Sequence, residues 1–443
     1  MNTIFLLALT ASLVSCEQNA VDDVVTVTYA LDEPAVVTVD FQTNVAGSVW
    51  ASIGERNFTT LAGDVNRYVA AETNRVIRWS AADDWPDHQL DSANFRAVLT
   101  AWPTNDPPPY MAVDLGAKQA ATREHTAVRY YVSSNAVPGG VLDVRYRRTR
   151  LLMKKIDCAG RVFRRGKVCS EPDYNNSRNN PTVAMLTKNF YISVFPFTCG
   201  YDRTARNSVT SVTDSNAPTS DATLLPAMGN GCKYSNLRGD PASGFNWPTD
   251  GDKVGGVMAD LRALTDGKVL FDLPLEAQYE FACQGGFETS LGTGKRYNNY
   301  RRNPEVIYET AWTKDNKDDG IDPEFPYPKI ADNGGRRPHT AGLLAPNGYG
   351  LYDMQGNGRS RCRDWWVEDL STVTDDLDAN GVHVDPKGPS SNANGYHGGR
   401  GCGWDTAVSS YDWTTYGRFP QGNDGDYNYT GYRVVCPAIA PDL

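Results

Sequence analysis

Several residue patterns that mark common active sites are missing from this chain of 443 residues. It has no CxxC pair, so a zinc-ribbon or thioredoxin-like site has no support. The five histidines are scattered without HExxH spacing, which argues against a histidine-based metal or catalytic site. Acidic residues outnumber basic ones, and the net charge of −10 argues against a general nucleic-acid-binding protein.

The N-terminal apolar run, residues 1–15, is too short to span a bilayer and has the length of a signal peptide. It ends in Leu13-Val14-Ser15-Cys16, which resembles the lipobox of bacterial lipoproteins. That resemblance implies cleavage before Cys16 and lipidation of this cysteine. We therefore predict a lipoprotein signal peptide at 1–15, a tether at 16–23, and a lipid-anchored protein of the bacterial cell envelope, at the outer membrane or cell surface. A plain secretory signal is the alternative.

Cysteine number fits an exported protein. Apart from Cys16, eight cysteines remain, and an even number in an exported chain predicts disulfides whose pairing the sequence does not define. These are Cys158, Cys169, Cys199, Cys232, Cys283, Cys362, Cys402 and Cys436.

The region after the tether alternates β-branched and polar residues. Residues 24–29 and 35–41 flank Leu-Asp-Glu-Pro and predict a hairpin, and further strands are expected at 48–53, 75–80 and 95–102. Short strands at this spacing predict an all-β, immunoglobulin-like sandwich over residues 24–118. Residues 119–187 form a transitional segment that leads into the next domain.

Four blocks then follow in a fixed order. They are KNFYISVFPFT at 188–198, FDLPLEAQYEFACQGG at 271–286, APNGYGLYDMQGN at 345–357 and GYRVV at 431–435. In this order they resemble the formylglycine-generating-enzyme, or sulfatase-modifying-factor, family. The resemblance implies a loop-rich α+β domain with a C-type-lectin-like fold over residues 188–438.

The second block predicts a helix on physical grounds as well. Pro274 suits the start of a helix, and Glu276 and Glu280 in its first turns favour the helix dipole. Leu275 stands where a capping side chain is preferred, and Gly285 ends the helix.

Active members of the family use copper bound by two cysteines. Aligned on Trp404, those positions fall at Thr406 and Tyr411, and neither can supply a thiolate to Cu(I). The resemblance instead favours a structural disulfide between Cys402 and Cys436, with a relocated active-site thiol as the alternative. No catalytic residue is therefore assigned.

Calcium is the one possible cofactor. The family's GNVWEWC turn binds calcium, but this chain has Asn357 followed by Ser360 in place of the carboxylate. Asn357 is thus a weak candidate ligand, and otherwise no cofactor is expected.

The tract 404–430 mixes aromatic rings with short polar residues, a composition typical of binding loops. We predict a non-catalytic, surface-anchored ligand-binding protein, and its variant is a variable protein of a diversity-generating retroelement. The alternative is a formylglycine-generating oxidase or accessory enzyme. The expected partner is an extracellular protein or glycan, without nucleic acid, and membrane contact would involve only the lipid anchor. The predicted ligand-binding residues, all expected at the surface, are Asp405, Thr406, Ser409, Ser410, Tyr411, Asp412, Trp413 and Tyr427.

Overall fold

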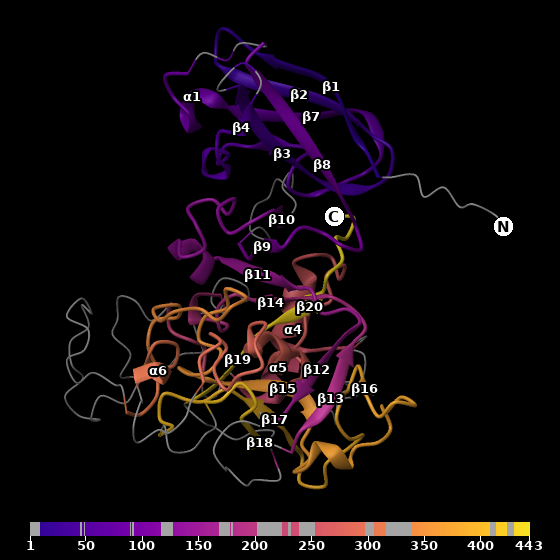
Figure 1. Ribbon diagram of the computed structural model, residues 1–443, viewed down its shortest axis with the longest axis vertical. Helices are drawn as coiled ribbons and strands as arrows, with labels where there is room; N and C mark the ends of the chain where they lie inside the picture. Colours follow the sequence, from indigo (N-terminus) through magenta and orange to yellow (C-terminus); the bar gives the residue numbers. More distant parts are fainter. Residues whose placement is uncertain are drawn as a thin grey trace, which may run out of the picture. The chain divides into compact units, whose positions relative to one another are not determined.

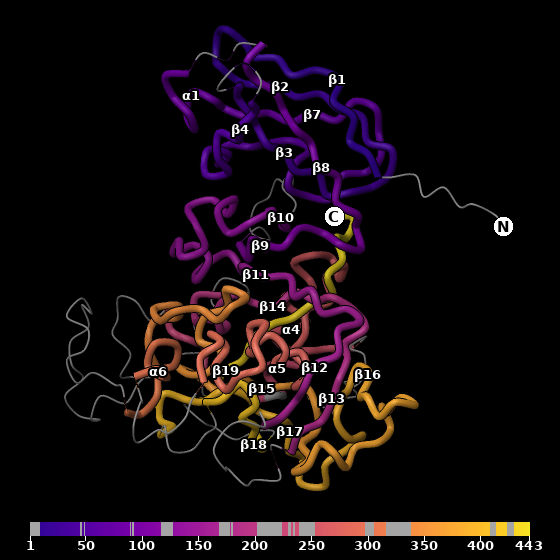
Figure 2. The backbone as a smooth tube through the Cα atoms, in the orientation of Figure 1, coloured from indigo at the N-terminus to yellow at the C-terminus, as the bar shows by residue number. Residues whose placement is uncertain are grey.

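The computed structural model divides into two compact units (Figures 1 and 2). Unit 1 comprises Met1–Val113, Ala121–Asp143 and Ala438–Leu443, and unit 2 comprises Asp114–Ala120 and Val144–Pro437. The structure describes residues 9–44, 47, 49–88, 90, 93–116, 127–167, 178, 180–201, 224–228, 232–238, 253–296, 305–315, 338–407, 413–422 and 429–443.

Unit 1 consists mainly of β-strands. Its elements are β1 (Ala11–Gln18), β2 (Val24–Leu31), β3 (Ala35–Asn44), β4 (Trp50–Ser52), the 3-10 helix η1 (Glu55–Asn57), β5 (Ala62–Gly63), β6 (Tyr68–Val69), β7 (Glu72–Ser80), α1 (Ala81–Asp84), β8 (Phe95–Pro103), β9 (Tyr110–Asp114) and β10 (Val128–Tyr131).

Two sheets of unit 1 share one hydrophobic core. One has the strand order β1-β2-β7-β5, and the other has β4-β3-β6 with β8 also paired to β3. Phe41 of β3 stacks on Trp79 of β7 with ring centroids 4.6 Å apart, and both side chains are fully buried. The strands expected around 48–53, 75–80 and 95–102 are confirmed as β4, β7 and β8.

The hairpin expected between residues 24–29 and 35–41, now β2 and β3, is wrong. β2 pairs with β1 and β7, whereas β3 pairs with β4, β6 and β8. The short Asp32–Pro34 connection therefore passes from one sheet to the other. Alternating apolar residues show that each strand has a buried face, but they do not show whether two strands pair or face each other across a core.

Strand β1 includes residues that we assigned to a signal peptide and a tether. It pairs with β2 from Ala11↔Leu31 to Gln18↔Val25, with an irregularity between Leu13 and Ser15. Cys16 is half-buried and packs against the core of unit 1. Cleavage before Cys16 stays a prediction, and such cleavage would remove residues 11–15 of this strand.

Unit 2 is a mixed α+β structure with short elements and long connections. Its elements are η3 (Val144–Arg147), β11 (Arg150–Ile156), β12 (Arg161–Arg165), β13 (Thr182–Leu186), β14 (Phe190–Ser193), α3 (Tyr234–Arg238), α4 (Gly256–Ala263), α5 (Glu276–Gln284), α6 (Glu305–Tyr308), β15 (Arg359–Trp365), η8 (Leu370–Thr372), β16 (His383–Val384), β17 (Tyr396–Arg400), β18 (Arg418–Gly422), β19 (Thr430–Tyr432) and β20 (Val435–Pro437).

Helix α5 packs against strands of two sheets in unit 2. β18-β17-β15-β19 and β12-β13-β16 form two sheets, and β14 lies between β11 and β20. Figure 1 shows α5 beside β12, β15 and β17, which it contacts together with β13. The predicted helix is confirmed: it begins at Glu276 and ends at Gly285, whose φ of 64° is the left-handed conformation expected of a glycine cap. No described helix is both long and apolar enough to cross a bilayer.

Candidate functional site

Helix α5 places two glutamates in the interior of unit 2. Glu276 and Glu280 are one helical turn apart, so their side chains lie on the same helix face, and both are fully buried. A buried carboxylate is costly unless opposite charges surround it. Three buried arginines, Arg165, Arg400 and Arg418, supply that charge.

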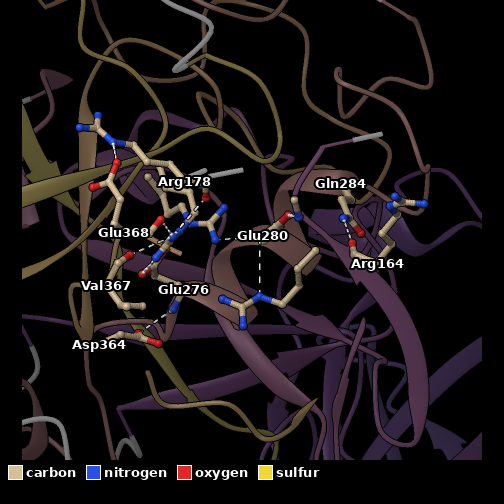
Figure 3. Close-up of polar contacts among 12 residues, drawn as sticks. Arg164, Arg178, Glu276, Glu280, Gln284, Asp364, Val367 and Glu368 are labelled. Carbon is tan, nitrogen blue, oxygen red and sulfur yellow. Dashed lines mark hydrogen bonds and ion pairs between the residues drawn. The ribbon is translucent and has the colours of Figure 1, made fainter. Parts of the chain in front are cut away.

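Glu276 binds two of these arginines (Figure 3). Its Oε2 accepts hydrogen bonds from Arg400 Nε at 2.9 Å and Arg418 Nε at 2.7 Å. Its Oε1 accepts a third from the terminal Nη2 of Arg418 at 2.8 Å. Burial alone would raise the pKa of Glu276, but Arg418 and Arg400 outweigh it and hold that pKa at about 2. The carboxylate is therefore ionised throughout the physiological range.

Glu280 extends the same network toward strand β12. Its Oε2 lies 2.7 Å from Arg400 Nη2 and 3.8 Å from Arg165 Nε. Its Oε1 accepts a hydrogen bond of 2.6 Å from the backbone N–H of Gly166. Arg400 thus bridges both glutamates, and the end of β12 is attached to α5.

Asp364 of β15 accepts a hydrogen bond from the first backbone N–H of helix α5. Leu275 at the N-cap has no capping oxygen, and the backbone N–H of Glu276 donates instead to Asp364 Oδ2 at 2.7 Å. Burial and the nearby Glu276 charge raise the pKa of Asp364 to about 6. Asp364, which is distant in the sequence, therefore replaces the capping side chain that Leu275 lacks.

The two arginines bound to Glu276 mark the two ends of one loop. Arg400 is the last residue of β17, Arg418 is the first of β18, and the two are paired in the sheet. We call Glu276, Arg400 and Arg418 the loop anchor and residues 401–417 the anchored loop. The loop leaves and re-enters the sheet at side chains fixed by one buried carboxylate, so its base is held independently of most of its own sequence.

The anchored loop contains most of the predicted ligand-binding residues, but two of them do not lie on the surface. Trp413 has no exposed area and packs with Leu291, Ile307, Ala311 and Cys402. Its backbone carbonyl accepts a hydrogen bond of 2.8 Å from Gln355 Nε2. The expectation that this ring is exposed is wrong, because an apolar cluster in unit 2 encloses it.

Thr406 is also buried, at 6% exposure, and its expected surface position is wrong too. Its hydroxyl closes a tight turn, accepting from the backbone N–H of Gly403 at 3.2 Å and donating to Asp405 Oδ1 at 3.3 Å. Asp405 is half-buried. The remaining predicted residues, Ser409, Ser410, Tyr411, Asp412 and Tyr427, lie outside the described residues.

The family assignment follows from the sequence of the same region. The profile of the Sulfatase-modifying factor enzyme 1-like domain matches residues 158–438, which is more than half of the chain. The chain belongs to this family. The match includes α5, the loop anchor and the anchored loop.

Characterised relatives match over shorter stretches. The formylglycine-generating enzyme of Bos taurus is 30% identical over 119 residues, which cover 27% of this chain and 26% of that enzyme. The formylglycine-generating enzyme of Thermomonospora curvata is 28% identical over 120 residues, which cover 27% of this chain and 34% of that enzyme. The chain therefore matches between a quarter and about a third of the length of these relatives.

Two solved structures are similar over most of their length. Treponema denticola variable protein 1 has a TM-score of 0.45 and 18% identity, with 65% of this chain and 96% of that protein covered. PvdO from Pseudomonas aeruginosa has a TM-score of 0.45 and 15% identity, with 65% and 94% covered.

The described side chains do not fit the copper site that the sulfatase-modifying-factor family implies. Thr406 stands at the first thiolate position, and its hydroxyl is engaged in the turn described above. It also accepts a hydrogen bond of 3.3 Å from Arg359 Nη2, so a cation lies beside this position. Copper(I) prefers thiolate ligands, and a neighbouring guanidinium opposes binding of a second cation. The second position, Tyr411, lies outside the described residues.

The contact of Arg359 with Thr406 was not predicted from the sequence, which indicated the Arg359–Arg361 turn only as an alternative ligand site. Its guanidinium lies over the rings of Phe419 at 4.4 Å and Tyr429 at 4.7 Å, and its side chain is half-buried. The signal was present in the sequence, because Arg359 stands where the family turn has a tryptophan. We treated that difference as the loss of a calcium turn and not as the gain of a cation.

The predicted disulfides are not found among the described cysteines. Cys16, Cys158, Cys199, Cys232, Cys283, Cys362, Cys402 and Cys436 all carry thiols, so the proposed Cys402–Cys436 bond is wrong. Cys402 packs against Trp413 in the cluster that stabilises the anchored loop, whereas Cys436 lies opposite Tyr191 in the pairing of β14 with β20. Buried thiols here fill apolar space as small hydrophobic side chains do. Cys169 lies outside the described residues.

The candidate calcium ligand Asn357 has a structural contact in this fold. Its Oδ1 accepts from the backbone N–H of His339 at 2.8 Å, and its Nδ2 donates to the His339 carbonyl at 2.9 Å. Among the described residues, no three His, Cys, Asp or Glu side chains gather closely enough to hold a metal ion. Calcium binding stays a prediction, and Asn357 offers it only one remaining lone pair.

Proposed function

We propose that this protein is a non-catalytic, lipid-anchored binding protein of the bacterial cell envelope, built on the sulfatase-modifying-factor scaffold. Its partner would be an extracellular protein or glycan, bound by the anchored loop 401–417 and the tract 423–429. The loop anchor is the observation that carries this proposal. One buried glutamate fixes both ends of the loop, so loop residues other than the buried Thr406 and Trp413 can serve recognition without being needed to hold the base of the loop.

Polar contacts also hold the two ends of the tract 423–429. Arg361 is 1% exposed, and its Nη1 donates a hydrogen bond of 2.9 Å to the carbonyl of Gly422, where β18 ends. The tract re-enters the sheet at Thr430, whose Oγ1 lies 3.4 Å from Gln421 Oε1. The anchored loop 401–417 and the tract 423–429 therefore both start and end at buried polar contacts. A narrower form of the proposal is a retroelement-diversified variable protein, in which sequence changes are confined to the anchored loop and this tract.

We also retain an immunoglobulin-like topology for unit 1 as a proposal.

The non-catalytic part of the proposal rests on Thr406 and Arg359. Oxidation of a sulfatase cysteine by the family's chemistry needs a copper–thiolate centre, and this position has a hydroxyl and a guanidinium instead. Cys402 is fully buried in the cluster with Trp413 and is badly placed to replace a surface thiolate.

Catalysis is tested with the full chain, copper and a reductant, acting on a peptide that carries a Cys-x-Pro-x-Arg sulfatase motif. We expect no formylglycine in the peptide by mass spectrometry. Turnover that disappears in Cys402→Ser would overturn the non-catalytic assignment, because Cys402 would then be an active-site thiol.

Binding is tested by screening the full chain against a glycan array and a panel of purified bacterial and host surface proteins. For any partner found, Tyr411→Ala and Tyr427→Ala should each weaken binding by roughly 30- to 1,000-fold, the effect of losing a hot-spot aromatic. Tyr396→Ala is the matched control, because Tyr396 is an exposed tyrosine of β17 outside both connections. An unchanged Kd in both loop variants would move the ligand site elsewhere.

A further inference from the structure

Unit 2 has a cavity that none of the loop residues lines. Its volume is about 430 Å³, and it lies against the β12–β13 hairpin and Glu288, which follows helix α5. The lining residues are Val162, Phe163, Arg164, Pro181, Thr182, Val183 and Glu288. This size falls within the range of small-molecule sites, and the lining combines apolar walls with a few charged groups, as such sites do.

The pleat of the hairpin determines which side chains face the cavity. Phe163 and Thr182 are buried, at 7% and 8% exposure, whereas Val162 and Val183 are 59% and 42% exposed. Successive residues of a strand point to opposite faces. The cavity therefore lies over the outward face, where Val162, Val183 and Arg164 project and Arg164 is paired in the sheet with Val183.

The adjacent arginines of β12 have different surroundings. Arg165 points inward and lies 3.8 Å from Glu280 in the buried charge network. Arg164 points the other way, and its backbone carbonyl is fixed by a hydrogen bond of 2.7 Å from Gln284 Nε2 of α5 (Figure 3). The strand is thus held firmly while the Arg164 side chain is left to line the cavity.

Both charged groups of the cavity lack a protein partner in the described part of the chain. The structure gives the Arg164 guanidinium no hydrogen bond or ion pair there, although its Nε is shielded from solvent. The Glu288 carboxylate is exposed and likewise has no ion-pair partner among the described residues. A shielded donor without a partner is costly, so such a group in a cavity points to a missing acceptor.

We propose that this cavity binds a small zwitterion with a short apolar body, such as an α-amino acid with an aliphatic side chain. The carboxylate of the ligand contacts the Arg164 guanidinium, its ammonium contacts Glu288, and its hydrocarbon packs on Val162 and Val183. Opposite charges on the two lining residues, with apolar walls beside them, are complementary to this chemistry and not to a purely anionic or purely cationic molecule.

The test uses three matched probes on the full chain, with binding measured by saturation-transfer NMR and calorimetry. L-leucine carries both charges, 4-methylpentanoate has only the carboxylate, and isoamylamine has only the ammonium. Leucine should bind most tightly. Arg164→Gln should weaken leucine and 4-methylpentanoate by about tenfold or more, the effect of losing a charge-assisted hydrogen bond. Glu288→Gln should weaken leucine and leave 4-methylpentanoate unchanged.

Arg161→Gln is the control, because Arg161 is in the same strand, bonds to the Asp157 carbonyl and does not line the cavity. It should bind leucine as the wild type does. Arg164→Gln should keep the wild-type unfolding midpoint, since its side chain has no described partner to lose. The proposal fails if no probe binds saturably, or if leucine affinity is the same in the wild type, Arg164→Gln and Glu288→Gln. A failure here leaves the loop proposal unaffected, because the two sites share no residue.

Discussion

Trp413 fills an apolar cluster with Leu291, Ile307, Ala311 and Cys402 and has no exposed surface. Truncating such a ring removes its burial and leaves a cavity, which typically costs about 3–5 kcal/mol. Trp413→Ala should therefore lower the free energy of unfolding by about that amount in urea or guanidinium titrations. Its effect on ligand binding should be indirect, through loss of the folded loop.

Tyr396 provides the comparison for Trp413, because it is 40% exposed at the start of β17. Tyr396→Ala should change the unfolding free energy by no more than about 0.5 kcal/mol, as most surface substitutions do. If Trp413→Ala were as stable as the wild type, the ring would be exposed in solution, and it would return to the set of candidate ligand contacts.

At the scale of elements, the loop anchor joins α5 to the ends of β17 and β18. Glu276→Gln removes the negative charge but keeps the shape, so Arg400 and Arg418 remain buried with too little compensating charge. Breaking one side of a buried ion pair typically costs about 3–5 kcal/mol. We expect a loss of this size in the unfolding free energy, together with faster hydrogen exchange in residues 401–417.

A matched control is available in the exposed pair of Lys295 and Glu309, whose side chains are 50% and 47% exposed. Glu309→Gln should cost less than about 1 kcal/mol, because solvent screens such a pair. Equal, small effects of Glu276→Gln and Glu309→Gln would show that the loop base does not depend on the anchor.

Strand β1 contains the predicted lipidation site, Cys16. Burial raises the pKa of the Cys16 thiol to about 11, so it is a poor nucleophile once β1 has paired with β2. Lipidation should therefore precede folding of unit 1. Metabolic labelling with an alkyne fatty acid should tag the wild type and not Cys16→Ala. Equal labelling of both, or a mature N-terminus upstream of residue 16, would exclude this anchor.

The elements that the sequence predicted correctly are those whose signals are local. Helix α5 has acidic residues in its first turns and Gly285 at its end, and both features act within a few residues. The partners of β2 and β3 could not be predicted in this way, because strand pairing depends on contacts between distant segments. Asp364 as the acceptor for the first N–H of α5 is equally non-local, since 88 positions separate it from Glu276.

The candidate site was predictable only in outline. The order of the motifs placed the site between the last two family-like blocks, and family membership confirms that scaffold. The burial of Trp413 and Thr406 was not predictable, because aromatic and short polar residues are used both on binding surfaces and inside loop-rich cores. The contact between the Arg359 guanidinium and Thr406 was not predictable either, because folding brings together two residues that are 47 positions apart.

Over the whole molecule, buried carboxylates with opposite pKa shifts should give stability a maximum in mildly acidic solution, because the pKa is raised for Asp353 and Asp364 and lowered for Glu276. Burial raises the pKa of Asp353 to about 6 from an ordinary value of 3.8, although Gly342 donates a 2.7 Å hydrogen bond to it. The folded state therefore takes up a proton between about pH 6 and 4 that the unfolded chain does not, and stability rises as pH falls through this window. The gain for Asp353 is about 3 kcal/mol at most.

Glu276 acts in the opposite direction at lower pH. Its folded pKa of about 2 lies below the ordinary 4.5, so its stabilising effect is complete above about pH 4.5 and is lost as the pH falls toward 2. Urea titrations of the wild type should thus show the highest unfolding free energy near pH 4.5–5. In Asp353→Asn, which keeps an acceptor for Gly342, the rise between pH 6.5 and 4.5 should shrink to the part that Asp364 contributes, while the fall below pH 4 persists. A wild-type profile that declines steadily from pH 7, with the same slope in Asp353→Asn, would show that Asp353 is ionised and compensated in the fold.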